Sequence, residues 1–227
     1  MTGTQLPIDF GHSPVFTAED FLIAPSNALA HGWVLRWPDW NAPGLALIGP
    51  AGAGKSHLAH LFAERSGASL LAAAELGLDD PPRFAGQAVV VEDADRGLGD
   101  ERALFHLYNL LIQSGGSLLV TGRDEPAHWP IRLPDLRSRL AALPVARLDP
   151  PDDALLQALL VKLFADRQIR VGEDVPGYLS RRMERSFDAA RALVAALDEA
   201  ALADKKPVSV PLARRVLADL FPGTEDV

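Results

Sequence analysis

The sequence contains no cysteine, and this absence removes several chemistries at once. Without a thiol there is no disulfide framework, no thiolate zinc site and no cysteine nucleophile. Aromatic residues are also scarce, at 7%. Basic residues are outnumbered by acidic ones, 22 to 30, which gives a formal net charge of −8. This negative net charge argues against a protein that binds nucleic acid over its whole surface, although it allows a local basic patch.

Targeting and membrane patterns are missing as well. The first residues lack the basic, apolar and small-residue succession of a secretory signal. The longest stretch without Asp, Glu, Lys or Arg is residues 103–122. His106, Asn109 and the glycine pair at 115–116 interrupt it, so it fits a helix, a turn and a buried strand better than a membrane span. We therefore expect a soluble, cytoplasmic protein.

The patterning divides the 227 residues into three regions. Residues 1–14 form an extended tail in which apolar residues alternate, followed by a breaker cluster at 11–14. Residues 15–150 alternate short apolar runs with helical patterns, and residues 151–227 show helical patterns alone. The chain is long enough for one large core domain with a smaller appendage.

The middle region predicts an α/β fold with a parallel sheet. Apolar runs that are not interrupted by polar residues are typical of parallel strands covered by helices on both faces. The predicted strands are residues 45–48, 69–72, 88–91, 118–121 and 143–146. The predicted helices are residues 55–65 and 101–113 in this region, and 154–168, 187–203 and 210–220 in the last one.

A phosphate-binding loop is the strongest motif in the sequence. Residues 49–56, GPAGAGKS, follow a predicted strand and open a predicted helix, as the Gly-x4-Gly-Lys-Ser pattern requires. Backbone N–H groups of such a loop, with the helix N-terminus, bind phosphate oxygens. Lys55 would reach the β- and γ-phosphates, and the Ser56 hydroxyl would bind magnesium. The alternative is a glycine-rich turn that matches the pattern by accident.

Two acids end the predicted strand at 88–91. Glu92 would hold the metal and Asp93 would orient or deprotonate the attacking water. The alternative interpretation is that both acids simply face solvent where the strand ends. Because Glu precedes Asp here, we expect intrinsic hydrolysis to be slow.

Several motifs, in order, resemble the DnaA family of AAA+ proteins. Residues 16–30, FTAEDFLIAPSNALA, are similar to the family's N-terminal segment, and the phosphate loop follows at the expected distance. Residues 118–123, LLVTGR, resemble the first sensor strand, and residues 136–140, LRSRL, resemble the arginine-finger segment. Residues 186–197 resemble the second sensor helix. The resemblance implies an AAA+ P-loop core with a parallel sheet, followed by a small all-helical lid domain.

The resemblance also implies roles for individual residues. Arg139 would be an arginine finger that acts in trans on a partner's nucleotide, with Asp93 and Thr121 as the other catalytic candidates. ADP or ATP would bind with Mg²⁺, and the metal would be held by Ser56 and Glu92. The nucleotide would contact Leu22, Ile23, Gly49, Pro50, Ala51, Gly52, Ala53, Gly54, Lys55, Ser56, His57 and Arg191.

Within this family the chain resembles the Hda-type regulators more than DnaA itself. We expect no basic helix-turn-helix DNA-binding domain after the lid. Residues 5–10, QLPIDF, resemble the peptide with which bacterial proteins bind the β sliding clamp of DNA polymerase III. Gln5 would be the polar anchor, and Leu6, Ile8 and Phe10 the apolar ones. The alternative is a tail that folds onto its own domain.

The resemblance implies negative regulation of replication initiation. Such a protein docks on the DNA-loaded clamp and stimulates hydrolysis of ATP bound to DnaA, with weak or no hydrolysis of its own. We expect no membrane and no sequence-specific DNA among its partners, and self-association stays open. Two alternatives remain: a nucleic-acid-binding initiator fragment or helicase loader, and a metabolic phosphoryl-transfer enzyme.

The basic residues of the last region are interpreted as solvated, because no aromatic residues are interleaved with them. They are Arg181, Arg182, Arg185, Lys205, Lys206, Arg214 and Arg215.

Overall fold

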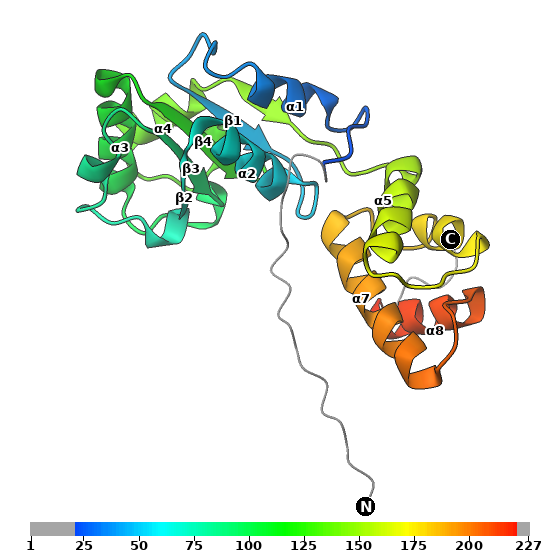
Figure 1. The fold of residues 1–227 in the computed structure, drawn as a ribbon. Helices are drawn as coiled ribbons and strands as arrows, with labels where there is room; N and C mark the ends of the chain where they lie inside the picture. Colours follow the sequence, from blue (N-terminus) through cyan, green and yellow to red (C-terminus); the bar gives the residue numbers. More distant parts are fainter. Residues whose placement is uncertain (1–20, 222–227) are drawn as a thin grey trace, which may run out of the picture.

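The computed structural model describes residues 21–221, so the tail at residues 1–14 lies outside the described part. A five-stranded parallel sheet forms the centre of the first lobe, in the order β2-β3-β4-β1-β5 (Figure 1). Its strands agree with the five predicted apolar runs, and the predicted α/β class is confirmed. They are β1 (Gly44–Ile48), β2 (Ser69–Ala72), β3 (Ala88–Glu92), β4 (Ser117–Gly122) and β5 (Val145–Arg147).

Helices cover both faces of this sheet, which explains why β1 and β4 are apolar on both sides. Alternate strand residues such as Leu45 and Leu47 pack with helices α1 (Ala28–Leu35) and α2 (Lys55–Ser66). Their neighbours Ala46 and Ile48 face the opposite core, which contains helices α3 (Glu101–Ser114) and α4 (Pro134–Ala141). Within residues 21–221 the lobe also contains the 3₁₀ turns Ala73–Glu75, Pro81–Phe84, Ala94–Arg96 and Pro126–His128.

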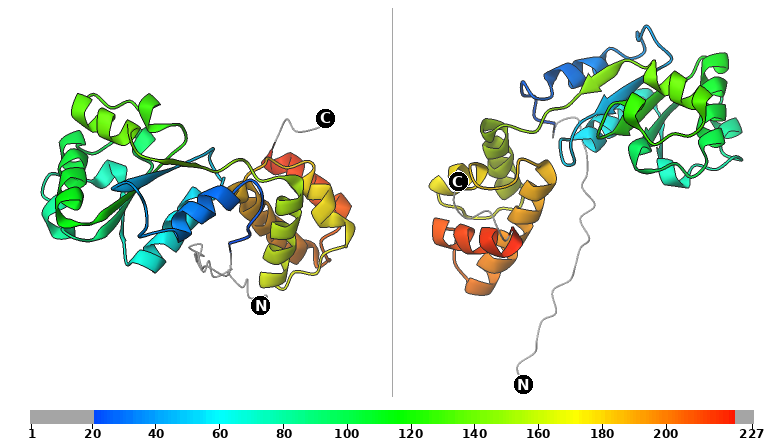
Figure 2. Two further views of the ribbon diagram at one scale, coloured as in Figure 1. Left: turned by 90° about the horizontal axis from the view of Figure 1, so that it is seen from above. Right: turned by 180° about the vertical axis from the view of Figure 1, so that it is seen from behind.

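The second lobe is a lid of four helices with a hydrophobic core of its own. Asp152 begins it by accepting a 2.8 Å hydrogen bond from the Leu155 N–H, which caps the first lid helix. The lid lies at one side of the sheet lobe, whereas α3 and α4 lie on the far side (Figures 1 and 2). Its helices are α5 (Asp153–Asp166), α6 (Asp174–Ser180), α7 (Phe187–Asp204) and α8 (Val210–Leu220).

The helices expected from periodicity agree with α2, α3, α5, α7 and α8, whereas α1, α4 and α6 were not predicted. The missed helices are eight residues long or shorter, and too few turns repeat for a pattern to stand out. Among residues 21–221, no helix combines the length and the apolar character that a membrane crossing needs.

Candidate nucleotide-binding site

The phosphate loop joins β1 to α2 in a conformation that depends on glycine. Gly52 and Gly54 have φ values of 67° and 96°, in the left-handed region where a side chain is disfavoured. Helix α2 begins immediately after Gly54, so Lys55 and Ser56 lie in its first turn. The Gly49 N–H donates a 3.2 Å hydrogen bond to the Gly122 carbonyl and ties the loop to the end of β4. The loop therefore presents a helix N-terminus at the carboxyl edge of the sheet, where anions bind.

Lys55 is folded over its own loop. Its ammonium donates hydrogen bonds to the carbonyl oxygens of Gly49, at 2.8 Å, and Pro50, at 2.9 Å, and the residue is only 8% exposed. Burial lowers the pKa of Lys55, although the neighbouring carboxylates of Asp93 and Asp95 act in the opposite direction. Phosphate oxygens would be stronger partners for this charge than the two carbonyls are.

The lid touches the phosphate loop directly. The Phe187 N–H, at the start of α7, donates a 2.8 Å hydrogen bond to the Gly52 carbonyl. Ser186 caps the same helix by accepting a hydrogen bond from the Ala189 N–H at 3.2 Å. A Cβ atom on Gly52 would overlap with the Ser186 side chain, so the loop and the lid approach each other too closely for any residue other than glycine.

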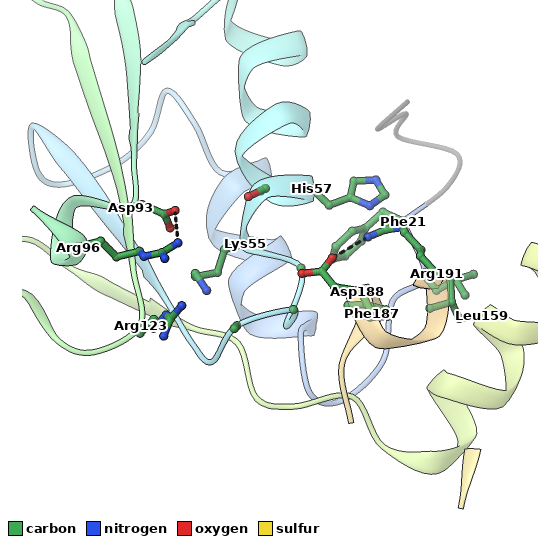
Figure 3. A pocket seen from close by; sticks show the side chains of 15 residues that line it. Phe21, Lys55, His57, Asp93, Arg96, Arg123, Leu159, Phe187, Asp188 and Arg191 are labelled. Atoms are coloured by element: carbon green, nitrogen blue, oxygen red, sulfur yellow. Dashed lines mark hydrogen bonds and ion pairs between the residues drawn. The ribbon is translucent and has the colours of Figure 1, made fainter. Parts of the chain in front are cut away.

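A pocket opens between the loop and the lid (Figure 3). At one end lie apolar side chains from the lid and from the segment before α1, together with the Asp188–Arg191 pair, and at the other end lie two arginines and Asp93 from the sheet edge. Lys55 lies between the two ends. This division suits a nucleotide, which has a flat base and a polyanionic tail. The lining residues are Phe21, Leu22, Ala51, Gly52, Gly54, Lys55, Ser56, His57, Asp93, Arg96, Arg123, Leu159, Phe187, Asp188 and Arg191.

Most of the predicted nucleotide-binding residues line this pocket, and four do not. Gly49 and Pro50 contribute carbonyl groups to Lys55 instead. Ala53 is buried in the core beneath the loop. Ile23 lies outside the lining and is 60% exposed, although the neighbouring Leu22 lines the pocket.

The two acids after β3 have different environments. Glu92 is half-buried, and one of its carboxylate oxygens is fully buried with no hydrogen-bond partner within the described residues. It lines, together with Ser56 and Asp93, a hollow beside the main pocket. Asp93 is exposed, has a left-handed φ of 56°, and pairs with Arg96 at 3.4 Å.

These acids fit the magnesium site that the sequence predicts. A buried carboxylate oxygen without a partner is costly, and a divalent cation would satisfy it. The described residues contain no cluster of three or more His, Asp or Glu side chains able to hold a metal. Mg²⁺ in nucleotide sites is commonly bound through one or two protein ligands, water and phosphate oxygens. Ser56 and Glu92 would be those protein ligands.

Thr121 holds the backbone of Asp93, in the turn after β3, and does not line the pocket. Its hydroxyl accepts a 2.9 Å hydrogen bond from the Asp93 N–H, and the residue is 1% exposed. A second link joins the same two strand ends, because the Arg123 N–H donates to the Asp95 carboxylate at 2.9 Å. The ends of β3 and β4 are thus held in register by two side chains.

Some lining residues were not predicted. Asp188 lies one turn before Arg191 on α7 and pairs with it at 3.3 Å, a spacing that the sequence displays. Arg96 and Arg123 closely follow motifs that were recognised. Phe21, Leu159 and Phe187 come from three separate segments, and only the packing of the lid brings them together.

Arg139 lies away from this pocket. It belongs to α4, is half-exposed and stacks over two rings of α3, at 5.2 Å from the Phe105 centroid and 5.4 Å from that of Tyr108. Within residues 21–221 it forms no ion pair with an acidic side chain.

Two of the basic lid residues form surface ion pairs, which agrees with the prediction that they are solvated. Arg185 pairs with Asp153 at 2.9 Å and Arg215 pairs with Asp204 at 2.8 Å, as solvated side chains do.

Two other lid arginines gather around an aromatic ring. Arg182 stacks on Tyr178 at 4.4 Å from the ring centroid, and Arg214 donates to its hydroxyl at 3.4 Å. The expectation that no aromatic accompanies these arginines is therefore wrong at Tyr178, which is four or more residues away from each of them in sequence.

Comparisons with known proteins agree with the motifs. Residues 152–217 match the family model described as the lid domain of Hda. The chromosomal replication initiator DnaA of Thermomicrobium roseum is 28% identical over 242 residues, which covers 93% of this chain and 51% of that protein. The chain thus spans about half the length of this curated relative.

Solved structures share the fold. Domain III of the Thermotoga maritima initiator DnaA superimposes with a TM-score of 0.80 and 20% identity, covering 92% of this chain and 98% of that one. A DnaA bound to AMPPCP and single-stranded DNA gives a TM-score of 0.68 and 15% identity, covering 85% of this chain and 68% of that one. Sequence, fold and lid agree: the chain is similar to the initiator DnaA, it has the fold of DnaA domain III, and its residues 152–217 match the lid domain of Hda.

Proposed function

We propose that the chain is a negative regulator of replication initiation. It binds an adenine nucleotide in the pocket between the phosphate loop and the lid, docks on the β sliding clamp through residues 5–10, and stimulates hydrolysis of ATP bound to DnaA. The observation that carries this proposal is the position of Arg139, which is half-exposed and separate from the chain's own pocket.

An arginine in this position suits action on a partner's nucleotide. In phosphoryl transfer, a guanidinium supplied in trans stabilises negative charge on the transferring group. Arg139 cannot do this for the chain's own nucleotide, because α3 and α4 lie on the far side of the sheet lobe from the lid (Figures 1 and 2). A DnaA molecule that packs its own phosphate site against α4 would receive the guanidinium.

The chain's own nucleotide has a structural role in this proposal. Lys55 and the loop amides bind the phosphates, and Arg191 and Phe187 of α7 close the pocket from the lid. Bound Mg²⁺ would neutralise charge between the phosphates. Ser56 and Glu92 would hold that ion, and Asp93 would orient water. The nucleotide thereby bridges the two lobes and fixes their relative position.

Relatedness supports DnaA as the partner. The family resemblance implies that the arginine finger acts on a partner's nucleotide, and this chain has the fold of DnaA domain III. The match of residues 152–217 to the Hda lid points to a regulator. Residues 5–10 supply the alternating apolar side chains and the glutamine that a clamp pocket takes.

A second candidate function is a nucleic-acid-binding initiator fragment or helicase loader. The observation that favours it is the Tyr178 ring, which contacts both Arg182 and Arg214 in the lid. Stacked aromatic and arginine side chains can hold single-stranded DNA. A gel shift with single-stranded and duplex DNA, in the absence of clamp, separates the two functions: the regulator gives no shift at physiological salt, and the loader gives one.

The proposed function is tested by hydrolysis of DnaA-bound ATP. Radiolabelled ATP is loaded on DnaA, and its conversion to ADP is followed with this protein, with DNA-loaded clamp, and with both. We expect acceleration only when both are present. Conversion at the basal rate in the complete mixture would contradict the proposal, and acceleration without clamp would remove the clamp from it.

A further inference from the structure

Two arginines of the lid are held by one tyrosine. Tyr178 lies on α6, and the Arg182 guanidinium stacks over its ring at 4.4 Å from the centroid. Arg214 comes from α8, and its Nε donates a 3.4 Å hydrogen bond to the Tyr178 hydroxyl. Tyr178, Arg182 and Arg214 are called the lid cluster below, and the exposed Arg181 adjoins it at the end of α6.

The arginines of the lid cluster carry charge that no carboxylate compensates. Within residues 21–221 neither Arg182 nor Arg214 forms an ion pair, and neither does the adjoining Arg181. By contrast, their sequence neighbours Arg185 and Arg215 both pair with acids of the lid. In a chain with a formal net charge of −8, the cluster is therefore a local positive patch.

Tyr178 orients both guanidinium groups and leaves most of their donors available. A guanidinium that stacks on a ring keeps its N–H groups in its own plane, so Arg182 is still able to donate to a phosphate. Arg214 uses its Nε for the hydroxyl, and its two terminal nitrogens make no hydrogen bond within the described residues. Because one side chain holds both groups, they lose less conformational freedom on binding an anion than two unsupported arginines would.

The surroundings of the lid cluster favour nucleic acid over a protein partner. Protein interfaces have an apolar centre, whereas interfaces with DNA are polar and positively charged. Among the described residues of the lid, the large exposed apolar side chains are Val161, Leu202 and Leu220, and none of them belongs to α6 or to the turn after it. The surface around the cluster thus lacks the apolar centre that a protein partner would need.

The Tyr178 ring is not available to a base. Proteins hold single-stranded DNA by stacking its bases on exposed aromatic faces. Tyr178 is half-buried and Arg182 lies over its ring, so the ring supports an arginine instead. Contacts to backbone phosphates need no unstacked base, and a duplex presents these phosphates in both strands. The cluster therefore suits duplex DNA.

We propose that the lid cluster binds the phosphate backbone of duplex DNA without sequence preference. This inference rests on the proposed function, which places the chain on a DNA-loaded clamp, and it names a DNA contact within that complex. A few phosphate contacts are weak alone, but on the clamp they become intramolecular and act at a high effective concentration. No residue of the cluster lines the nucleotide pocket, and α4 lies on the far side of the sheet lobe from the lid (Figures 1 and 2). DNA, nucleotide and DnaA would thus occupy separate surfaces.

The test measures duplex binding by the full chain in the absence of clamp and DnaA. Fluorescence anisotropy of a short labelled duplex of arbitrary sequence is followed over a range of salt concentrations. We expect the wild type to bind at about 30 mM salt and to release the duplex at physiological salt. The double variant Arg182→Ala, Arg214→Ala should bind about ten-fold more weakly, and the slope of log affinity against log salt should fall by about two, one for each lost phosphate contact.

The double variant Arg185→Ala, Arg215→Ala is the matched control. It removes the same number of charges from the same part of the lid, but these arginines are already ion-paired, so the salt slope should stay as in the wild type. Equal losses in both double variants, no duplex binding by the wild type at about 30 mM salt, or tighter binding of a single strand than of the duplex overturn the inference.

Two further outcomes separate this inference from other roles. If the Arg182→Ala, Arg214→Ala variant keeps duplex binding but loses clamp or DnaA binding in a DNA-free pull-down, the cluster binds an acidic protein surface and the inference is overturned. A chain that binds duplex through the cluster but does not accelerate hydrolysis of DnaA-bound ATP contradicts the proposed function alone. Failure of the duplex contact, in turn, leaves the action of Arg139 on DnaA as proposed.

Discussion

The Arg139 guanidinium lies over the Phe105 ring, 5.2 Å from its centroid, so this side chain of α4 packs on α3. A second contact fixes the two helices at their beginnings. The Glu101 carboxylate accepts hydrogen bonds from the N–H groups of Leu133, at 2.6 Å, and Arg132, at 2.9 Å. Helix α4 is thereby anchored to α3 just before its first turn.

Replacing Phe105 should weaken the finger without removing it. In Phe105→Leu the apolar bulk stays and the ring is lost, which costs about 0.5–1 kcal/mol of cation–π energy. Stimulation of DnaA-bound ATP hydrolysis should fall by about two- to five-fold. ADP binding should be unchanged, because the pocket is elsewhere.

Phe84 offers the control for that variant. The Arg83 guanidinium lies over the Phe84 ring, 5.2 Å from its centroid, but Phe84 does not contact Arg139. Phe84→Leu should leave the stimulation unchanged in a folded sample. A fall of the same size in both variants would show that ring loss acts through general loosening of the lobe and would contradict the orienting role.

The substitution Gly52→Ala should weaken both the contact between lid and loop and the binding of ADP. The left-handed φ of 67° at Gly52 and the overlap of a Cβ atom with Ser186 act together in this variant. We expect the Phe187–Gly52 hydrogen bond to break, the lid to separate from the loop, and the ADP affinity to fall by at least ten-fold. Limited proteolysis at the junction near residue 150, with calorimetry, measures both effects.

A substitution at Gly67 separates the effect of backbone strain from the effect of steric overlap with the lid. Gly67 has a φ of 69°, and a Cβ atom there would meet nothing within 4 Å. Gly67→Ala therefore costs only the backbone strain, about 1–2 kcal/mol. It should lower stability without changing ADP affinity. If both variants bound ADP as the wild type does, the contact between lid and loop would have no role in the site.

The sequence was informative where chemistry is local. The motif at residues 49–56 requires glycines, a lysine and a serine in consecutive positions, and the structure places Lys55 and Ser56 at a helix start as expected. The apolar runs predicted the strands because β1 and β4 are covered on both faces. The residues that come together through the lid could not be predicted, since Phe187 and Leu159 meet the loop only through tertiary packing. Nor does spacing reveal that the Tyr178 ring contacts arginines of two separate segments.

Nucleotide affinity should depend on the protonation of Lys55 in alkaline solution. Burial lowers the pKa of Lys55 below its ordinary value of 10.5, and phosphate binding favours the charged form. The affinity for ADP is therefore full while the lysine is protonated, and it falls as pH rises through the lowered pKa. The phosphate ionises near pH 6 and adds no further change above about pH 8.

Calorimetry with ADP between pH 8 and the ordinary lysine pKa of 10.5 measures this fall. Lys55→Arg supplies the control, because a guanidinium stays charged throughout this range. Its affinity should be weaker but independent of pH. A wild-type affinity that stays constant up to 10.5 would contradict the effect of burial on Lys55.

Clamp binding should depend on the apolar side chains of the tail. Buried apolar anchors dominate contacts of this kind, so the double variant Leu6→Ala, Phe10→Ala should lose clamp binding while ADP binding stays normal. Surface plasmon resonance on immobilised clamp measures clamp binding, and calorimetry measures ADP binding. Asp9→Ala, between the anchors, should retain most of the binding. Full clamp affinity in the double variant would refute the assignment of the tail.

Substitutions of Arg139 test directly whether this chain supplies an arginine to the nucleotide of DnaA. DnaA carrying labelled ATP is mixed with DNA-loaded clamp and with wild type, Arg139→Ala, Arg139→Lys or Arg137→Ala. Arg137 is an exposed arginine of the same helix and is the matched control. Arginine fingers contribute about 10³ to 10⁵ in rate, which corresponds to about 4–7 kcal/mol of transition-state stabilisation.

We expect Arg139→Ala to fold, to bind ADP and to bind clamp, yet no longer to accelerate the conversion of ATP to ADP. Arg139→Lys should fail as well, because an ammonium lacks the planar set of donors. Arg137→Ala should be fully active. Acceleration by Arg139→Ala equal to that of the wild type would contradict the proposal that this chain acts on DnaA by supplying an arginine in trans.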